Sequence, residues 1–206
     1  QTEGDIAVKG GQVVEIGPDI KGKATREIDA GGKFVLPGGV DSHCHIEQLT
    51  ASGLMNADTF ETATRSAAFG GTTTVIPFAA QHVGMSLTKV VEDYHAAAAR
   101  GALVDYAFHM ILCDPRPEIL ADELPPLARA GHGSLKVFLT YDRLRVEDAQ
   151  FLDVLDAQRT FTEARVTLAE LASATAASRA KVVQVVGPEP LDSPSASSLR
   201  IDLVLG

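Results

Sequence analysis

The feature that most constrains the fold is a regular alternation of strand-like and helix-like segments between Phe34 and Gln158. Four times in succession, a short apolar or β-branched run is followed by a segment with the residue spacing of an amphipathic helix. Parallel strands need long crossover connections, so this alternation predicts an α/β fold with a parallel sheet. Such a sheet either closes into a (β/α)₈ barrel or stays open as a doubly wound sheet.

Capping and turn residues give the boundaries of these segments. Asp58 and Ser86 are the expected N-caps of two helices, which end at Gly70-Gly71 and Gly101. The expected strands are one that resumes at Val40, Thr72–Ile76, Val104–Leu112 and Ser134–Tyr141, and the expected helices are Asp58–Phe69, Ser86–Arg100, Pro115–Ala130 (disturbed by Pro125-Pro126) and Val146–Gln158.

Segments outside this alternation predict a small β module and a different C-terminal region. Asp5–Ile16 alternates like a strand pair turned at Gly10-Gly11, and Arg26–Asp29 is a further short extended piece. Near the other end, Thr167–Val183 is an Ala-rich helical stretch, and the segment Gly187–Ser198 is rich in Pro and Ser, as loops are.

Composition excludes several classes of protein. With 18 basic and 27 acidic residues, the net charge is −9, which argues against nucleic acid as a partner. A hydrophobic content of 45% without any apolar run of about 20 residues predicts a globular, cytoplasmic protein with no membrane partner. Cys44 and Cys113 lack metal-site spacing, so we expect reduced, buried thiols.

The strongest chemical signal is the pair His43 and His45 within the run PGGVDSHCHIE (Pro37–Glu47). Side chains two apart on a strand leave the same face, so both imidazoles can reach one metal ion while Cys44 points the other way. Alone, the pair is a weak signal, because a polar face on an edge strand gives the same spacing. Its place at the end of a strand that opens a β/α series favours a barrel with a metal site.

The quoted stretch resembles the first barrel strand of the amidohydrolase superfamily, specifically of the hydantoinase and dihydropyrimidinase family. The stretch that carries this likeness is IDAGGKFVLPGGVDSHCHI (Ile28–Ile46). The resemblance is close over roughly the first 159 residues of the chain and thinner afterwards. Three more segments are similar to successive strand regions of that family, in its order: AAFGGTTTVIPFAAQ (Ala67–Gln81), VDYAFHMILCDP (Val104–Pro115) and GSLKVFLTYDRLRVEDAQFLDVL (Gly133–Leu155).

The resemblance implies a metal-dependent (β/α)₈ TIM-type barrel with a small β-sandwich module built from both ends of the chain. The module would comprise residues 1–36 and 184–206, with Arg200–Leu205 as its returning C-terminal strand, and the barrel residues 37–183. Only about four β/α units are present, so strands five to eight are missing between about 159 and 163. Either the sequence joins segments that are separate in the real polypeptide, which we favour, or the deletion is genuine. A half-barrel leaves unpaired sheet edges that another chain must cover.

The resemblance also implies cofactors. His43 and His45 would bind two divalent metal ions, with Zn²⁺ expected and Mn²⁺ or Co²⁺ as options, and carboxylated Lys136 would bridge them. Two neighbouring cations need a bridging anion, and a lysine becomes one by forming a carbamate from its neutral amine. An isolated strand lysine would instead be an ordinary solvated side chain.

Further site residues follow from the same resemblance. Tyr141, at the end of the fourth strand, would donate its hydroxyl to the oxyanion formed when hydroxide attacks the ring amide. In the loop Gln48–Asn56, Leu54 and Met55 either line an apolar pocket for a ring substituent or form a dimer contact. The remaining histidines are expected to be structural or at the surface, with His109 the one to watch: His82, His95, His109 and His132.

The implied activity is metal-dependent hydrolysis of a small cyclic amide, opening hydantoins or dihydropyrimidines to N-carbamoyl amino acids, in a homodimer or homotetramer. The alternatives are another amidohydrolase ring opening, of allantoin or dihydroorotate, and a non-catalytic dihydropyrimidinase-like assembly protein. The family's two further histidines and its catalytic aspartate have no counterpart in the sequence, so the chain taken alone is expected to be weak or inactive.

Overall fold

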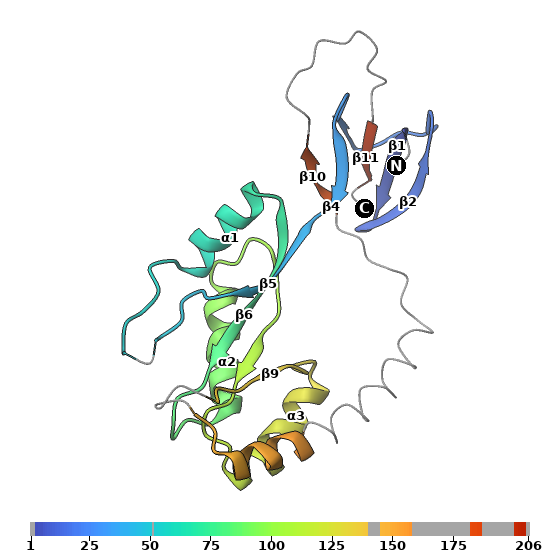
Figure 1. Ribbon diagram of the computed structural model, residues 1–206. Helices are drawn as coiled ribbons and strands as arrows, with labels where there is room; N and C mark the ends of the chain where they lie inside the picture. The colour runs from blue at the N-terminus through green and yellow to red at the C-terminus, as the bar shows by residue number, and fades with distance from the viewer. Residues whose placement is uncertain (1–2, 51, 140–144, 158–181, 187–199, 205–206) are drawn as a thin grey trace. The chain divides into compact units, whose positions relative to one another are not determined.

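A computed structural model describes residues 3–50, 52–139, 145–157, 182–186 and 200–204 of the chain (Figure 1). The chain divides into two compact units, one of Gln1–Gly39 with Ala176–Gly206 and one of Val40–Thr175. Within the described ranges, no helix is both long and apolar enough to cross a lipid bilayer.

The first unit consists of β-strands from both ends of the chain. Strands β1 (Asp5–Lys9) and β2 (Gln12–Gly17) pair antiparallel across Gly10 and Gly11, whose φ angles of 57° and 74° suit a two-residue hairpin turn. This confirms the predicted strand pair. The remaining strands of the unit are β3 (Arg26–Asp29), β4 (Phe34–Pro37), β10 (Val182–Val186) and β11 (Arg200–Val204).

Strand β11 returns to the N-terminal strands, as expected of Arg200–Leu205. It lies between β1, which it pairs in parallel, and β3, which it pairs antiparallel, giving the sheet order β2-β1-β11-β3. Strand β10 pairs with β4 in a separate two-stranded sheet. The predicted helix Thr167–Val183 is therefore wrong at its end, where Val182 and Val183 begin a strand. Its other residues, and the expected loop Gly187–Ser198, lie outside the described residues.

The second unit contains the predicted parallel sheet. Its strands are β5 (Gly39–Cys44), β6 (Thr72–Ala80), β8 (His109–Ile111) and β9 (Leu135–Lys136), in the order β5-β6-β8-β9, with β7 (Asp105–Tyr106) also paired to β6. The pairs β6–β7, β6–β8 and β8–β9 are all parallel. The predicted parallel pairing is therefore confirmed for these three strand pairs.

The third strand differs from its expected form, because Val104–Leu112 is not continuous. Strand β7 pairs Thr74 with Asp105, and β8 pairs Phe78 with His109 in the same register along β6. The backbone N–H of Ala107 donates to the carbonyl of Val75 at 3.2 Å between the two pieces. One irregular strand thus keeps a constant alignment with β6.

The first two helices begin at side-chain caps. Helix α1 (Phe60–Phe69) is capped by Thr59, whose hydroxyl accepts the Thr62 N–H, so the expected N-cap Asp58 is wrong by one residue. Asp58 instead accepts a hydrogen bond from the Thr62 hydroxyl. Helix α2 (Leu87–Ala99) is capped by Ser86, as predicted.

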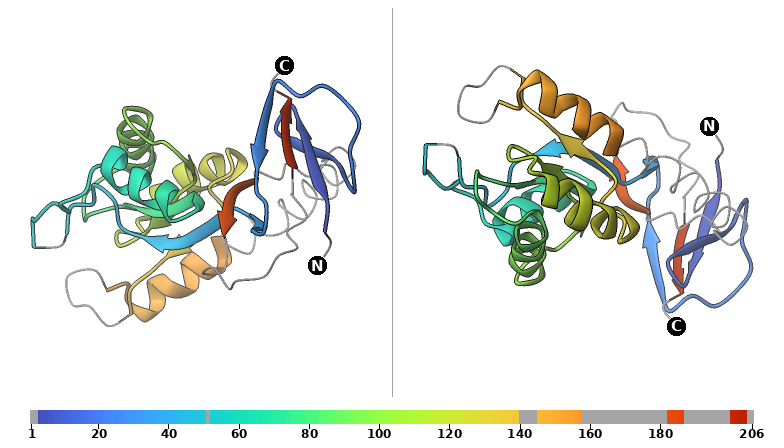
Figure 2. Two further views of the ribbon diagram at one scale, coloured as in Figure 1. Left: turned by 90° about the horizontal axis from the view of Figure 1, so that it is seen from above. Right: turned by 90° about the horizontal axis from the view of Figure 1, so that it is seen from below.

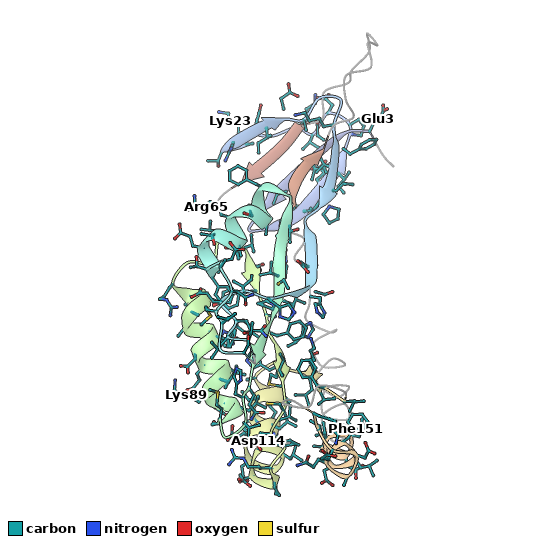
Figure 3. The ribbon with its side chains drawn as sticks, turned by 60° about the vertical axis from the view of Figure 1, so that its left-hand side comes forward. Glu3, Lys23, Arg65, Lys89, Asp114 and Phe151 are labelled. Atoms are coloured by element: carbon teal, nitrogen blue, oxygen red, sulfur yellow. The ribbon has the colours of Figure 1, made fainter. Side chains whose placement is uncertain are left out.

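Helices α1 and α2 both pack against β6 (Figure 2). Arg65 of α1 and Lys89 of α2, labelled in Figure 3, pair with Glu61 and Asp93 one helical turn away. All four side chains are more than half exposed, so these pairs add little to stability.

The third helix is the main local departure from expectation. Instead of one helix over Pro115–Ala130, a π-helical turn at Ile119–Glu123 leads into α3 (Leu124–Arg129). Pro125 and Pro126 fall in the first turn of α3, where a missing N–H costs nothing. Residues 148–157 form a further helix, consistent with the expected Val146–Gln158 apart from its ends.

A buried glutamine ties the ends of two strands together. Gln81, 1% exposed after β6, accepts hydrogen bonds through Oε1 from the backbone N–H groups of Cys113 and Asp114, both at 3.1 Å. Its Nε2 donates to the carbonyl of Met85 at 3.0 Å. One side chain thus satisfies three backbone groups in the loops that follow β6 and β8.

Replacing Gln81 by leucine is expected to lower the free energy of unfolding by about 2 kcal/mol, because two N–H groups and a carbonyl lose their partner. Urea denaturation followed by circular dichroism measures this. A change within about 0.5 kcal/mol, the range of ordinary surface substitutions, would contradict it.

Candidate metal centre at the strand ends

The sheet of the second unit has two chemically different faces. Alternate residues contribute to the hydrophobic core with α1, α2 and α3, and these are Cys44, Val75, Ala79, Met110, Leu112, Leu135 and Val137. The intervening residues gather in a second group that includes Phe78, Ala80, Ile111 and Phe138. Because side chains alternate along a strand, residues next to those of the helix-covered face belong to the opposite face. His43, His45, His109 and Lys136 all occupy such positions.

His43 and His45 lie on this opposite face, as their spacing predicts. His43 is in β5 and His45 follows the strand's end, with ring centroids 5.4 Å apart. Both rings contact Phe78 of β6, at centroid distances of 4.7 and 5.0 Å, and both histidines are exposed. Cys44, between them, packs into the core instead. The two imidazoles therefore have a common support and free access to solvent.

The structure brings Lys136 to the same ring. Strand β9 pairs Lys136 with Ile111 of β8, and the Lys136 Nζ lies 4.3 Å from the ring centroid of Phe78 and 5.0 Å from that of Phe138. An ammonium over an aromatic face is stabilised by cation–π attraction. Two histidines and one lysine, from strands far apart in the sequence, therefore surround Phe78.

His109 is a residue of this face whose role the sequence did not predict. Its Nε2 donates to the carbonyl of Ser42 at 3.0 Å, and its Nδ1 lies 2.7 Å from the hydroxyl of Ser134. A carbonyl only accepts, so the proton is on Nε2 and Nδ1 accepts from Ser134 when the ring is neutral. Both ring nitrogens are thus engaged, and His109 connects β5, β8 and the start of β9.

Glu47, also missed at the sequence level, anchors the segment that follows the histidines. It adopts a left-handed backbone conformation with φ 45°. Its Oε2 accepts the Phe60 N–H at 2.8 Å, at the start of α1, and its Oε1 lies 3.3 Å from the Arg100 guanidinium. Only the unusual backbone geometry, which sequence does not report, distinguishes this glutamate. It fixes where the segment after β5 lies relative to α1 and the end of α2.

Leu54 and Met55 have no contact with this cluster among the described residues, and a third predicted site residue is not described. Tyr141 lies outside the described residues. Leu54 and Met55 are described and are 69% and 59% exposed, in a loop closed by the bridge between Leu49 and Met55. Their contribution to a substrate pocket stays a prediction.

Both cysteines are free thiols, as expected. Cys113 is buried as predicted, whereas Cys44 is only partly buried. Burial, with a smaller effect of Asp41, raises the pKa of the Cys44 thiol to about 11. Burial, with a smaller effect of Asp114, also raises the pKa of the Cys113 thiol to about 11. Both groups are therefore protonated near neutral pH, which makes them poor nucleophiles.

We expect iodoacetamide at pH 8 to alkylate neither cysteine readily in the folded chain, because the reactive form is the thiolate. Intact mass spectrometry measures the extent of alkylation. Both sites are expected to react when the same experiment is done in guanidinium chloride. Fast labelling of Cys113 without denaturant would contradict its burial.

The chain is similar to known proteins, although no family model matches it. Over 153 residues, it is 39% identical to the D-hydantoinase of Ralstonia pickettii, covering 74% of this chain and 33% of that protein. A solved structure of D-hydantoinase matches with a TM-score of 0.71 at 37% identity, over 76% of this chain and 34% of that one. The crystal structure of dihydropyrimidinase from Brevibacillus agri NCHU1002 matches with a TM-score of 0.68 at 30% identity, over 76% of this chain and 37% of that one.

The chain thus spans about a third of the length of the relatives it matches. The matched solved structures indicate a TIM-barrel fold, so the parallel sheet β5-β6-β8-β9 belongs to a barrel. This decides between the two arrangements that the strand–helix alternation left open.

Proposed function

We propose that this chain, which belongs to the hydantoinase family, carries part of a metal-dependent centre that opens hydantoin or dihydropyrimidine rings to N-carbamoyl amino acids. The main support is the convergence of His43, His45 and Lys136 on Phe78. Neither other ring opening, of allantoin or dihydroorotate, nor a non-catalytic assembly role is favoured by any observation.

The donor set fits divalent metal ions in its chemistry. His43 and His45 offer imidazole nitrogens, which suit Zn²⁺ and also Mn²⁺ or Co²⁺. As an ammonium, Lys136 would repel the ions. Its neutral amine would add CO₂ and lose a proton to form a carbamate, which would supply the bridging anion. No group of three His, Cys, Asp or Glu residues suited to a metal occurs among the described residues. The three residues would therefore form part of a ligand set.

Each candidate site residue has a proposed role in the reaction. His43 and His45 would hold the ions at the open end of β5, and Lys136, as a carbamate, would bridge them. When bound, the metal ions supply Lewis acidity that makes hydroxide available near neutral pH. Tyr141 would donate its hydroxyl to the developing oxyanion. Leu54 and Met55 would contact the apolar substituent of the ring.

The wider setting of the centre is also proposed. We place the barrel at residues 37–183 and a β-sandwich module at residues 1–36 with 184–206, since the N- and C-terminal strands share one sheet. A cytoplasmic homodimer or homotetramer is the expected form, acting on a small molecule.

The experiment that tests this function combines metal analysis with turnover. The purified chain is loaded with Zn²⁺, dialysed and assayed for bound metal and for ring opening of hydantoin and dihydrouracil. Retained metal with measurable N-carbamoyl product supports the proposal. Absence of retained metal, or retained metal that Lys136→Met leaves unchanged, contradicts it. Lys89→Met is the matched control, because Lys89 lies on the exposed side of α2.

A further inference from the structure

A second pair of histidines lies away from the strand-end cluster. His95 is on α2 and His132 is in the turn between α3 and β9. Their Nε2 atoms face each other at 3.3 Å, with ring centroids 5.1 Å apart and planes inclined by 62°. Both side chains are half-buried. Two residues 37 positions apart in the sequence thus bring their Nε2 atoms close together.

The surroundings fix the two rings. The His95 ring packs edge-on against Phe108, at 4.9 Å and 89°, and tilted against Tyr106, at 5.8 Å. The backbone N–H of His132 donates to the carbonyl of Leu127 at 3.0 Å. Gly131 precedes it with φ 106°, a conformation that favours glycine. The pair is therefore held by packing on one side and by a glycine turn on the other.

The separation of the two nitrogens fits two ligands of one metal ion as well as a long hydrogen bond. Hydrogen bonds from ring nitrogens usually have a length of about 2.9–3.0 Å, so 3.3 Å is long for one. A tetrahedral zinc ion with Zn–N bonds of about 2.0–2.1 Å holds neighbouring nitrogens about 3.3–3.4 Å apart. The 3.3 Å separation therefore falls in the range expected for two nitrogens bound to one ion.

The protonation states also suit ligands. A metal binds neutral imidazole, and its ligand nitrogen must be free of a proton. Burial, with a smaller effect of His95, lowers the pKa of His132, so the neutral ring predominates at pH 7.5. In each ring the proton can reside on Nδ1, leaving both Nε2 atoms as donors to the ion.

We propose that His95 and His132 chelate one divalent transition-metal ion, of the Zn²⁺, Ni²⁺ or Cu²⁺ class, through their Nε2 atoms, with water completing the coordination. The site is separate from His43, His45 and Lys136. It would clip α2 to the segment that leads into β9, the strand that carries Lys136. Its role is then to stabilise the fold rather than to contact substrate.

The test uses the untagged full chain with His43→Ala, His45→Ala and Lys136→Met, so that the proposed strand-end centre is absent. Isothermal titration with Ni²⁺ and Zn²⁺ at pH 7.5 is expected to show one ion per chain and a metal-dependent rise in Tm. Adding His95→Gln or His132→Gln is expected to weaken binding at least about tenfold, since ligand loss exceeds the effect of an outer-shell partner. His82→Gln is the matched control and is expected to leave binding unchanged.

Spectroscopy keeps the inference testable if a variant is less stable. The Cu²⁺ complex of the same background is expected to show nitrogen hyperfine splitting from two imidazoles by electron paramagnetic resonance. Absence of saturable binding, or binding that survives His95→Gln with His132→Gln, would overturn the proposal and leave a simple hydrogen-bonded pair. Neither result affects the strand-end centre, because its ligands are absent from this background.

Discussion

Replacing His43 and His45 together by alanine is expected to weaken Zn²⁺ binding at the strand ends by at least about 100-fold, the upper end of the effect of losing an outer-shell partner. Both imidazoles are lost from the face of the sheet that also presents Lys136, and a lysine alone repels a cation. Isothermal titration of the His95→Gln, His132→Gln chain, with and without the two alanines, measures the change at one site. Ring-opening activity, where present, is expected to disappear with the metal.

The control for this prediction separates the loss of metal ligands from the loss of packing on Phe78. Both rings pack on Phe78, so their loss also removes apolar contacts, and the unfolding transition must be recorded beside the titration. His43→Gln with His45→Gln retains similar bulk but offers no imidazole, and is expected to lose metal equally. Unchanged affinity in either double variant would mean that these histidines are not ligands.

The parts of the fold that sequence predicted well depend on local signals. Ser86 begins α2 because its hydroxyl accepts the Lys89 N–H, and Gly10 and Gly11 turn the first hairpin because both adopt positive φ. The opposite-face position of His43 and His45 follows from strand alternation alone. The nearness of Lys136 to them required the family resemblance, because strand order β5-β6-β8-β9 is not a local property.

The features that sequence did not predict depend on contacts between distant segments. Glu47 has its role because Phe60 and Arg100 come to its two carboxylate oxygens, and nothing in HCHIE identifies it. His95 and His132 lie side by side in the structure, but in the sequence His95 is only a helix residue and His132 only a turn residue. The π-helical turn before α3 similarly has no simple pattern of its own, although Pro125 and Pro126 marked the disturbance.

Replacing Phe60 by alanine is expected to lower the free energy of unfolding by about 3–5 kcal/mol, the range for large aromatic residues in a core. Phe60 is fully buried at the first position of α1. Its ring centroid lies 6.1 Å from that of Phe108, in an edge-on arrangement, and 6.3 Å from that of Tyr106. The cavity would open beside Tyr106 and Phe108 in the core. Urea denaturation followed by circular dichroism measures the effect.

Phe69, at the other end of the same helix, is the matched control because the same chemical change there removes little packing. It is 89% exposed, so Phe69→Ala is expected to change the free energy of unfolding by no more than about 0.5 kcal/mol. The contrast between the two variants isolates burial from helix propensity, since both introduce alanine into α1. Equal effects would mean that Phe60 is not part of the core that supports the strand carrying His43.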